Sequence, residues 1–106
     1  MLLHNLKDFI GGWIVGDFEP TLLKTKEFEV AVKRYEAGDH DLAHYHKEAD
    51  EITVIVSGTV IMNGKHHVAN DVVLIKKGEA VEFSASSDAV TCVIKVPSVK
   101  GDKYRV

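Results

Sequence analysis

Short apolar runs separated by turn residues make up most of the chain, and almost no stretch has the 3.6-residue periodicity of a helix. Phe28, Val30 and Val32 alternate with polar residues between 27 and 35, as in a strand with one buried face. Asn63-Gly64, the dipeptide that best forms a two-residue hairpin turn, separates two apolar runs at 60–62 and 66–68. Further runs at 13–15, 52–56, 72–75, 81–83 and 90–96 extend the pattern. Many short strands joined by turns predict an all-β sandwich or barrel.

The amino-terminal segment is the exception to this pattern. Leu2, Leu6, Phe9 and Ile10 fall on one face of a short helix, which Gly11 and Gly12 would end. We therefore expect a short helical or irregular segment before the first strand.

Size, charge and cysteine content limit the classes of protein to consider. The 106 residues fit a single domain, 1–106. With a formal charge of −3 and no basic block, nucleic acid and anionic membranes are poor partners. No apolar run reaches the length of a membrane span, and the start of the chain lacks the features of a secretory signal. Cys92 is the single cysteine, which excludes an internal disulfide and suits a cytoplasmic location.

Self-association is expected because a chain this short is only modestly stable alone. The run from Ile52 to Val56 is apolar on both faces, so each face must be covered by a core or by a partner. Residues 1–26, with their aromatic segment from Phe9 to Phe18, are the second candidate contribution to an interface. We expect a homodimer in which this segment packs on, or adds a strand to, the partner's sheet.

Histidines cluster in the middle of the chain. His44 and His46 are two residues apart on a predicted strand, so both imidazoles leave the same face, roughly 6.6 Å apart along it. Glu51 follows at the start of the next apolar strand. An isolated His-x-His pair is a weak signal, and exposed strand histidines are its ordinary explanation.

The full spacing is more specific than the pair. Gly38, five residues, His44-x-His46, four residues, Glu51, six residues and Gly58 resemble the first conserved motif of the cupin superfamily at every fixed position. The resemblance covers about residues 27–96 and implies a jelly-roll, or double-stranded β-helix, fold forming a small barrel. It also implies that His44, His46 and Glu51 bind a metal ion inside the barrel.

The second cupin motif is matched only in part. In its register Gly78 matches, whereas Asn70 replaces the first glycine, Lys76 the proline, and Val81 the histidine that is usually the fourth ligand. Two histidines and one carboxylate suit Fe(II), and also Mn, Zn or Ni. The loss of one ligand should weaken binding at least about tenfold, so the site is expected to be weak, completed by substrate, or empty.

Other side chains are candidates to replace the missing ligand. His40 shares strand parity with the two motif histidines but falls in a turn, and His66 and His67 follow the hairpin turn and should face water. Cys92 on the last long strand is expected to be a buried apolar residue, and the alternative interpretation is a thiolate ligand of the metal. Glu48 and Asp50, beside the motif, are expected to be solvated or to hold a histidine N–H.

Three residues are candidates for contact with a small-molecule substrate. Val81 and Phe83 lie on the strand that carries the second motif. Arg34 shares parity with Val30 and Val32, and it would reach the barrel mouth only if those residues line the barrel.

The leading interpretation is a metal-binding cupin, an oxygenase or isomerase if it is an enzyme, acting on a small oxygen-rich molecule. The alternatives are a non-enzymatic ligand-binding cupin, which Val81 favours, and a metal-free sugar isomerase or epimerase with a histidine base. Fold alone decides none of these.

Overall fold

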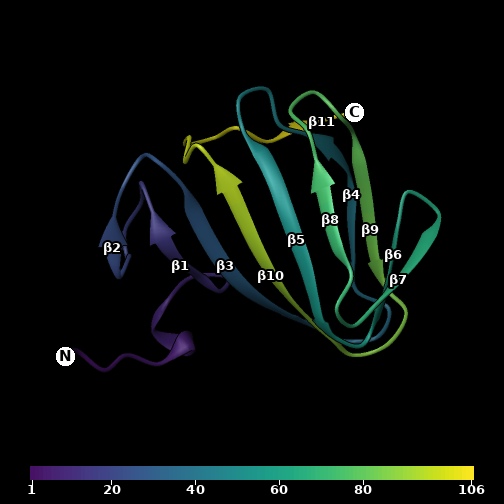
Figure 1. The fold of residues 1–106 in the computed structure, drawn as a ribbon, viewed down its shortest axis with the longest axis horizontal. Coiled ribbons are helices and arrows are strands. Elements are labelled where there is room, and N and C mark those ends of the chain that lie inside the picture. Colours follow the sequence, from purple (N-terminus) through teal and green to yellow (C-terminus); the bar gives the residue numbers. More distant parts are fainter.

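The computed structural model describes residues 1–106, and its regular structure consists of two β-sheets and one short 3₁₀ turn (Figure 1). The strands of the larger sheet are ordered β2 (Leu23–Lys24), β1 (Trp13–Gly16), β3 (Glu29–Tyr35), β10 (Ala89–Val96), β5 (Asp50–Ser57) and β8 (Val72–Ile75). Those of the smaller sheet are ordered β11 (Tyr104–Arg105), β4 (His40–Tyr45), β9 (Val81–Ala85), β6 (Thr59–Met62) and β7 (Lys65–Val68). All pairs except β1 with β2 are antiparallel. This architecture confirms the predicted all-β jelly roll.

The predicted turns position the strands as expected. Asn63 and Gly64 both have positive φ angles, 50° and 78°, as a type I′ turn between β6 and β7 requires. The Asn63 side chain also accepts a hydrogen bond from the Glu82 N–H and donates one to the Ala80 carbonyl, which ties the hairpin to β9. Asn70, which replaces a motif glycine, has φ 78°, a conformation that asparagine tolerates better than most residues.

The amino-terminal segment contains one short 3₁₀ turn, Leu6–Asp8, and no longer helix. Asn5 caps this turn, and the Asp8 side chain accepts a hydrogen bond from the Asn5 N–H in return. β1 then pairs with β3 and with the two-residue edge strand β2 of the same chain, so the aromatic segment belongs to its own sheet. No helix in the structure has the length and apolarity needed to cross a membrane.

The core lies between the inner faces of the two sheets. Its buried side chains come from both sheets and are Ile55, Val60, Met62, Ile75, Val81, Phe83 and Ala89. On β3, Ala31 is fully buried, and Glu29, Lys33 and Tyr35 line the interior cavity, so the odd-numbered residues face inward. Val30, Val32 and Arg34 therefore face outward, and the condition for Arg34 to reach the barrel mouth is not met.

Gly58, the last glycine of the first motif, provides a test of backbone constraint. It has φ 80°, and a Cβ at this position would collide with the carbonyl oxygen of Asp88. Gly64 has φ 78° but open space around the same position, so it is a matched control.

We predict that Gly58→Ala destabilises the protein more than Gly64→Ala does. Both variants pay about 1–2 kcal/mol for a left-handed alanine, and Gly58→Ala adds an overpacking cost of about 1–3 kcal/mol. Urea unfolding followed by circular dichroism measures the two free energies. Equal losses for the two variants would contradict the close packing of Gly58 against Asp88.

Candidate metal centre

Two strands bring the three motif residues to the barrel interior. His44 lies near the end of β4, opposite Val81 of β9, and His46 follows immediately after β4. Glu51 lies near the start of β5. Their exposed fractions are 8% for His44, 2% for His46 and 8% for Glu51. The sequence pattern thus predicted three buried polar side chains on neighbouring parts of the chain, and burial makes surface histidines an inadequate explanation.

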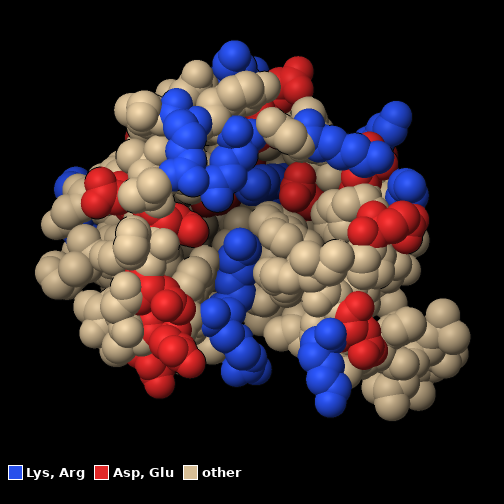
Figure 2. All heavy atoms as spheres, turned by 180° about the vertical axis from the view of Figure 1, so that it is seen from behind, with Lys and Arg blue, Asp and Glu red and all other residues tan.

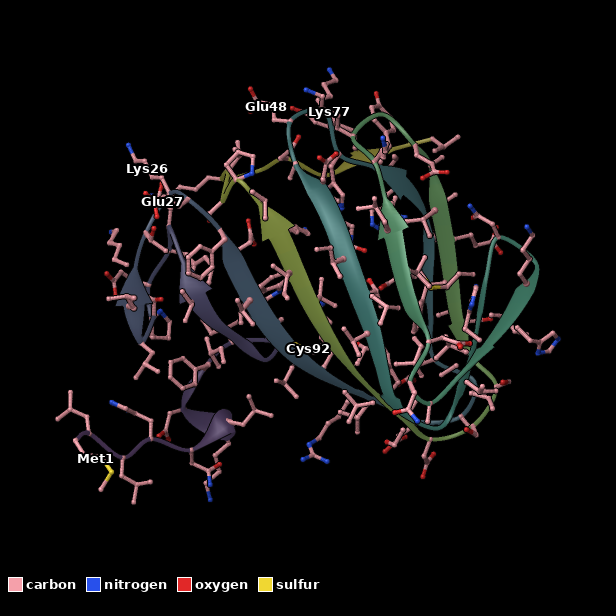
Figure 3. All side chains as sticks on the ribbon, viewed as in Figure 1. Met1, Lys26, Glu27, Glu48, Lys77 and Cys92 are labelled. Atoms are coloured by element: carbon pink, nitrogen blue, oxygen red, sulfur yellow. The ribbon has the colours of Figure 1, made fainter.

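Both imidazole rings are oriented by main-chain carbonyls. His44 Nδ1 lies 3.0 Å from the Leu42 carbonyl oxygen, and His46 Nδ1 contacts the carbonyl oxygen of Asp102. A carbonyl can only accept, so each Nδ1 carries the proton and donates it. In the neutral rings each Nε2 is then left as a bare acceptor, which is the form that ligates metal ions. The carboxylates of Glu48 and Asp50 do not hold these rings: Glu48 is exposed, and Asp50 accepts from the Lys77 N–H in the opposite loop (Figure 3).

The acceptor on His46 faces another acceptor. Its Nε2 is buried without a hydrogen-bond partner, and Glu51 Oε1 lies 3.4 Å away. Thr53 donates a hydrogen bond of 3.1 Å to the other carboxylate oxygen, Oε2. Two facing acceptors in a buried site are unfavourable unless a proton or a cation lies between them. The distance of 3.4 Å is too long for a good hydrogen bond. With a neutral His46 ring, the contact is therefore one of two lone pairs that face each other.

Ionisation at the site reflects burial and nearby charge. Burial alone would raise the pKa of Glu51, but a proton on the facing His46 nitrogen, the positive charge of Lys95 and the hydrogen bond from Thr53 act the other way, and the pKa is lowered. Burial lowers the pKa of His44, and Lys103 lowers it further, against the hydrogen bond to Leu42. These shifts favour a carboxylate beside a neutral imidazole, which are the states that bind a cation.

The three side chains do not form a complete cage. The His44 and His46 rings are 5.2 Å apart between centroids, and no group of three His, Cys, Asp or Glu side chains is gathered closely enough to hold a metal ion as it stands. Val81, 4% exposed, contributes a methyl surface where a fourth ligand would project. The geometry thus provides a two-residue core, His46 with Glu51, and a third candidate, His44, nearby.

Asp102 is a site residue that the sequence analysis missed. Asp102 as a whole is 7% exposed. Its carboxylate accepts hydrogen bonds of 2.8–3.3 Å from the N–H groups of Lys47, Glu48 and Ala49. Its carbonyl also orients His46. The only signal in the sequence was an aspartate in the polar carboxyl-terminal tail, and nothing local indicates that this tail folds back over the motif.

An interior cavity of about 450 Å³ adjoins the site. His44 and Glu51 line it, and so do Val81 and Phe83, the two predicted substrate-contacting residues of β9. His46 lies outside the lining. The remaining walls come from β1 and the loop after it, from β3, β4 and β10, and from the carboxyl-terminal segment. They include Trp13, Phe18, Lys33, Tyr35, Val93 and Lys95, together with the carboxylates of Asp17, Glu19, Glu29 and Asp41. Burial raises the pKa of Tyr35 to about 12, so its phenol is a neutral hydrogen-bonding group in this wall.

The other sequence candidates lie away from the cavity. Cys92 faces outward on β10 between Val32 and Val54, because its neighbours Thr91 and Val93 face inward (Figure 3). Arg34 and His40 border a separate surface groove. His66 and His67 lie on β7, and His67 approaches Asp71 at 3.9 Å. None of these residues is placed to supply the missing ligand.

Comparison with known structures assigns the fold. A protein from Klebsiella pneumoniae with a double-stranded β-helix domain superposes with a TM-score of 0.70 over 93% of this chain and 87% of its own, at 19% identity. An RmlC-like cupin from Shewanella frigidimarina gives 0.67 over 72% of this chain and 71% of its own, at 15% identity. A bacterial pirin from Escherichia coli in complex with nickel(II) gives 0.69 over 82% of this chain and 39% of its own, at 19% identity.

These likenesses confirm the cupin fold predicted from the motif spacing. No family model matches the sequence, and no curated protein matches it. The chain is therefore similar to cupins in structure at a level of identity that speaks for the fold alone.

We predict that Asp102→Ala destabilises the protein by about 3 kcal/mol, because three main-chain N–H groups lose a buried charged acceptor. Asp39→Ala is the control, since the Asp39 carboxylate accepts one N–H, from Glu36, in an exposed turn. That variant should lose about 1 kcal/mol or less. Urea unfolding measures both values, and a loss no larger for Asp102→Ala than for the control would exclude a structural role for this carboxylate.

Proposed function

We propose that the protein binds a divalent metal ion at His46, Glu51 and His44, and that the bound ion holds a small chelating, oxygen-rich ligand in the adjoining cavity. The observation that carries the proposal is the bare, buried Nε2 of His46 facing Glu51 Oε1. A cation between these two atoms would remove the repulsion of their lone pairs. The nickel(II) complex of the structurally similar pirin supports the choice of a divalent ion.

The spacing of the two atoms fits such an ion. Two ligands of a tetrahedral ion with bonds of about 2.1 Å lie about 3.4 Å apart. The structure gives 3.4 Å between His46 Nε2 and Glu51 Oε1. His44 would have to turn toward this pair to bind as the third ligand. Thr53, Leu42 and the Asp102 carbonyl hold the three side chains through their remaining polar atoms, as outer partners of metal ligands do.

A bound divalent ion would supply Lewis-acid polarisation of a ligand oxygen. Phe83 and Val81 would exclude water from one side of the ligand, and the neutral Tyr35 phenol could donate a hydrogen bond to it. Oxygenation and isomerisation of a small molecule are both compatible with these walls. The metals to test are Fe(II), Mn(II), Zn(II) and Ni(II), all of which imidazole and carboxylate accept.

Val81 favours a second candidate function, the binding of a small ligand without metal. This residue lines the cavity with an apolar surface where a complete cage would have an imidazole. In this candidate the cavity and its polar walls hold the ligand, and His46 carries a second proton that satisfies Glu51.

We predict that the purified protein binds one equivalent of divalent metal and that His46→Ala weakens binding about tenfold or more. His66→Ala, a histidine on the exposed β7 strand, should bind as the wild type does. Competition with a chelator measures the affinities for Zn(II), Mn(II), Ni(II) and Fe(II). No binding by the wild type, or equal weakening by both variants, would favour the metal-free candidate.

A gain-of-function variant tests the same site in the opposite direction. Val81→His should strengthen metal binding, because position 81 lies opposite His44 and lines the same cavity. Glu82→His is the control, since residue 82 is exposed on the other face of β9. Chelator competition compares the two variants, with circular dichroism to check the fold. A folded Val81→His variant that binds no more tightly than Glu82→His would show that the cavity is not built as a metal cage.

We propose in addition that the protein is a homodimer formed through the outer face of the larger sheet. Side chains of β10, β5, β8 and β3 give this face a continuous apolar surface: Val90, Cys92, Ile94 and Val96, Ile52, Val54 and Val56, Val72 and Leu74, and Val30 and Val32. Val72 is 65% exposed and Leu74 54%. Arg34 and Asp50 are the only charged residues on these strand faces, and both lie at strand ends, so the apolar surface between them suits a second copy of itself in a two-fold interface.

We predict that Leu74→Lys yields a monomer while the wild type has twice the 11.7 kDa mass of the chain. A buried, unpaired lysine on each side of the two-fold axis would cost more than the interface can offset. Leu42→Lys is the control, because Leu42 is 57% exposed on the smaller sheet. Light scattering at micromolar concentration measures the masses, and a monomeric wild type would contradict the dimer.

A further inference from the structure

Two lysines converge on one indole ring inside the cavity. Lys33 Nζ lies 5.3 Å, and Lys95 Nζ 5.0 Å, from the centroid of Trp13. The strand register explains the convergence, because Trp13 of β1 lies beside Ala31 of β3, and Ala31 lies beside Val93 of β10. Ala31 and Val93 have small side chains. Lys33 lies two residues beyond Ala31 on β3, and Lys95 two residues beyond Val93 on β10, so the two lysines flank this pair on the same inner face. The cation–π contacts hold both amines in place.

Neither ammonium has a carboxylate within ion-pair distance. The ion pairs in the structure join Lys24 to Glu19, His46 to Glu51 and His67 to Asp71. The nearby carboxylates have other contacts: Glu51 is bound by Thr53, and Asp102 by three main-chain N–H groups. Asp41 attracts Lys33 and Glu29 attracts Lys95 without closing an ion pair. Two positive charges thus face the cavity with hydrogen-bonding capacity to spare.

The two amines differ in their surroundings: Lys95 has Glu29 and Glu51 as its partners on the two adjacent strands, whereas Lys33 lies opposite Thr91. Burial lowers the pKa of Lys33, and the charges of Lys103 and Lys95 lower it further against the attraction of Asp41. Figure 2 shows Lys and Arg side chains gathered along a hollow on the face opposite the view of Figure 1. Lys100 and Lys103 are further basic residues of the cavity lining. Carboxylates also line the cavity, but none of them lies within ion-pair distance of Lys33 or Lys95, so a bound carboxylate would supply the acceptor that these two ammonium groups lack.

The lysine pair lies directly beside the candidate metal centre. Lys95 and Glu51 are partners across β10 and β5, so their Cα atoms are about 5 Å apart. Lys33, Lys95, Glu51 and His44 all line the same 450 Å³ cavity. A ligand of a few carbon atoms can therefore reach both the lysine pair and the metal-site residues. Its apolar part would lie against Tyr35 and Phe83, whose rings pack with centroids 4.7 Å apart.

We propose that Lys33 and Lys95, held over Trp13, form a subsite for the carboxylate of a small organic acid that occupies this cavity. The choice of a carboxylate over a phosphate follows from the donors present. Phosphate sites often use arginine forks or helix amino termini, and the lining of this cavity contains no arginine and no helix residue. The proposal extends the proposed function by naming its ligand class, but the lysine subsite itself needs no metal.

Trp13 makes the subsite directly observable, because it is the only tryptophan in the chain. Its fluorescence should change saturably when glutarate or succinate is added to the full-length protein. Succinamide, which has the same length without charge, should produce no change. Titration calorimetry gives the affinity independently of the indole signal. Both measurements are made with a chelator present, so that they report on the lysines without metal.

We expect Lys33→Met and Lys95→Met each to weaken dicarboxylate binding about tenfold or more. Methionine is similar to lysine in length but has neither its charge nor its hydrogen-bond donors. Lys95→Arg should retain binding, and Lys65→Met, on the exposed β7 strand, should equal the wild type. Circular dichroism checks that the variants fold. We expect them to fold, because removing a partly buried charge also removes its desolvation cost.

Four results would overturn the proposal: no saturable dicarboxylate binding, unchanged binding in Lys33→Met and Lys95→Met, equal loss in Lys65→Met, or tighter binding of inorganic phosphate than of either dicarboxylate. The outcomes separate this subsite from the metal centre. Dicarboxylate binding that depends on Lys33 in a protein without metal affinity supports the subsite and removes the metal. Metal binding without any effect of the lysines on dicarboxylate affinity removes the subsite and leaves the metal centre.

Discussion

The buried carboxylate of Asp102 holds the candidate site together. It accepts the N–H groups of Lys47, Glu48 and Ala49, while its own carbonyl orients His46. These contacts join residues more than fifty positions apart and fix the loop between β4 and β5, which begins with His46 and leads into the strand that carries Glu51. Without this acceptor, three N–H groups would be left without their partner and His46 would lose the support of the loop that follows it.

Burial divides the barrel interior into two chemically different ends. One end is filled by Ile55, Val60 and their neighbours and supplies hydrophobic stabilisation. The other end holds the cavity and, at its edge, two groups of opposite character: an acceptor pair, His46 with Glu51, and a donor pair, Lys33 with Lys95. The acceptor pair suits a cation and the donor pair suits an anion, so a ligand that chelates at one end and is acidic at the other would satisfy both.

The sequence predicted the strands and the motif well because both are local. Alternation in β3, the Asn63-Gly64 turn and the spacing from Gly38 to Gly58 each depend on neighbouring residues only, and the structure confirms the strands and the turn. Which face of β3 points inward does not follow from neighbouring residues alone. The inference for Arg34 took the apolar side, Val30 and Val32, as the interior, but this strand is apolar on its outer face and carries Glu29 and Lys33 inside. A polar cavity and an apolar exterior invert the usual rule.

By itself, then, the sequence determined an all-β jelly roll and singled out His44, His46 and Glu51, three polar residues that the structure buries. Only the tertiary structure decided the roles of Asp102, Trp13, Lys33 and Lys95. Asp102 acts through a tail that returns to the motif from the far end of the chain, and the two lysines meet over an indole from three different strands. Such contacts depend on strand order and register, which are set by the packing of the whole barrel and leave no spacing pattern in the chain.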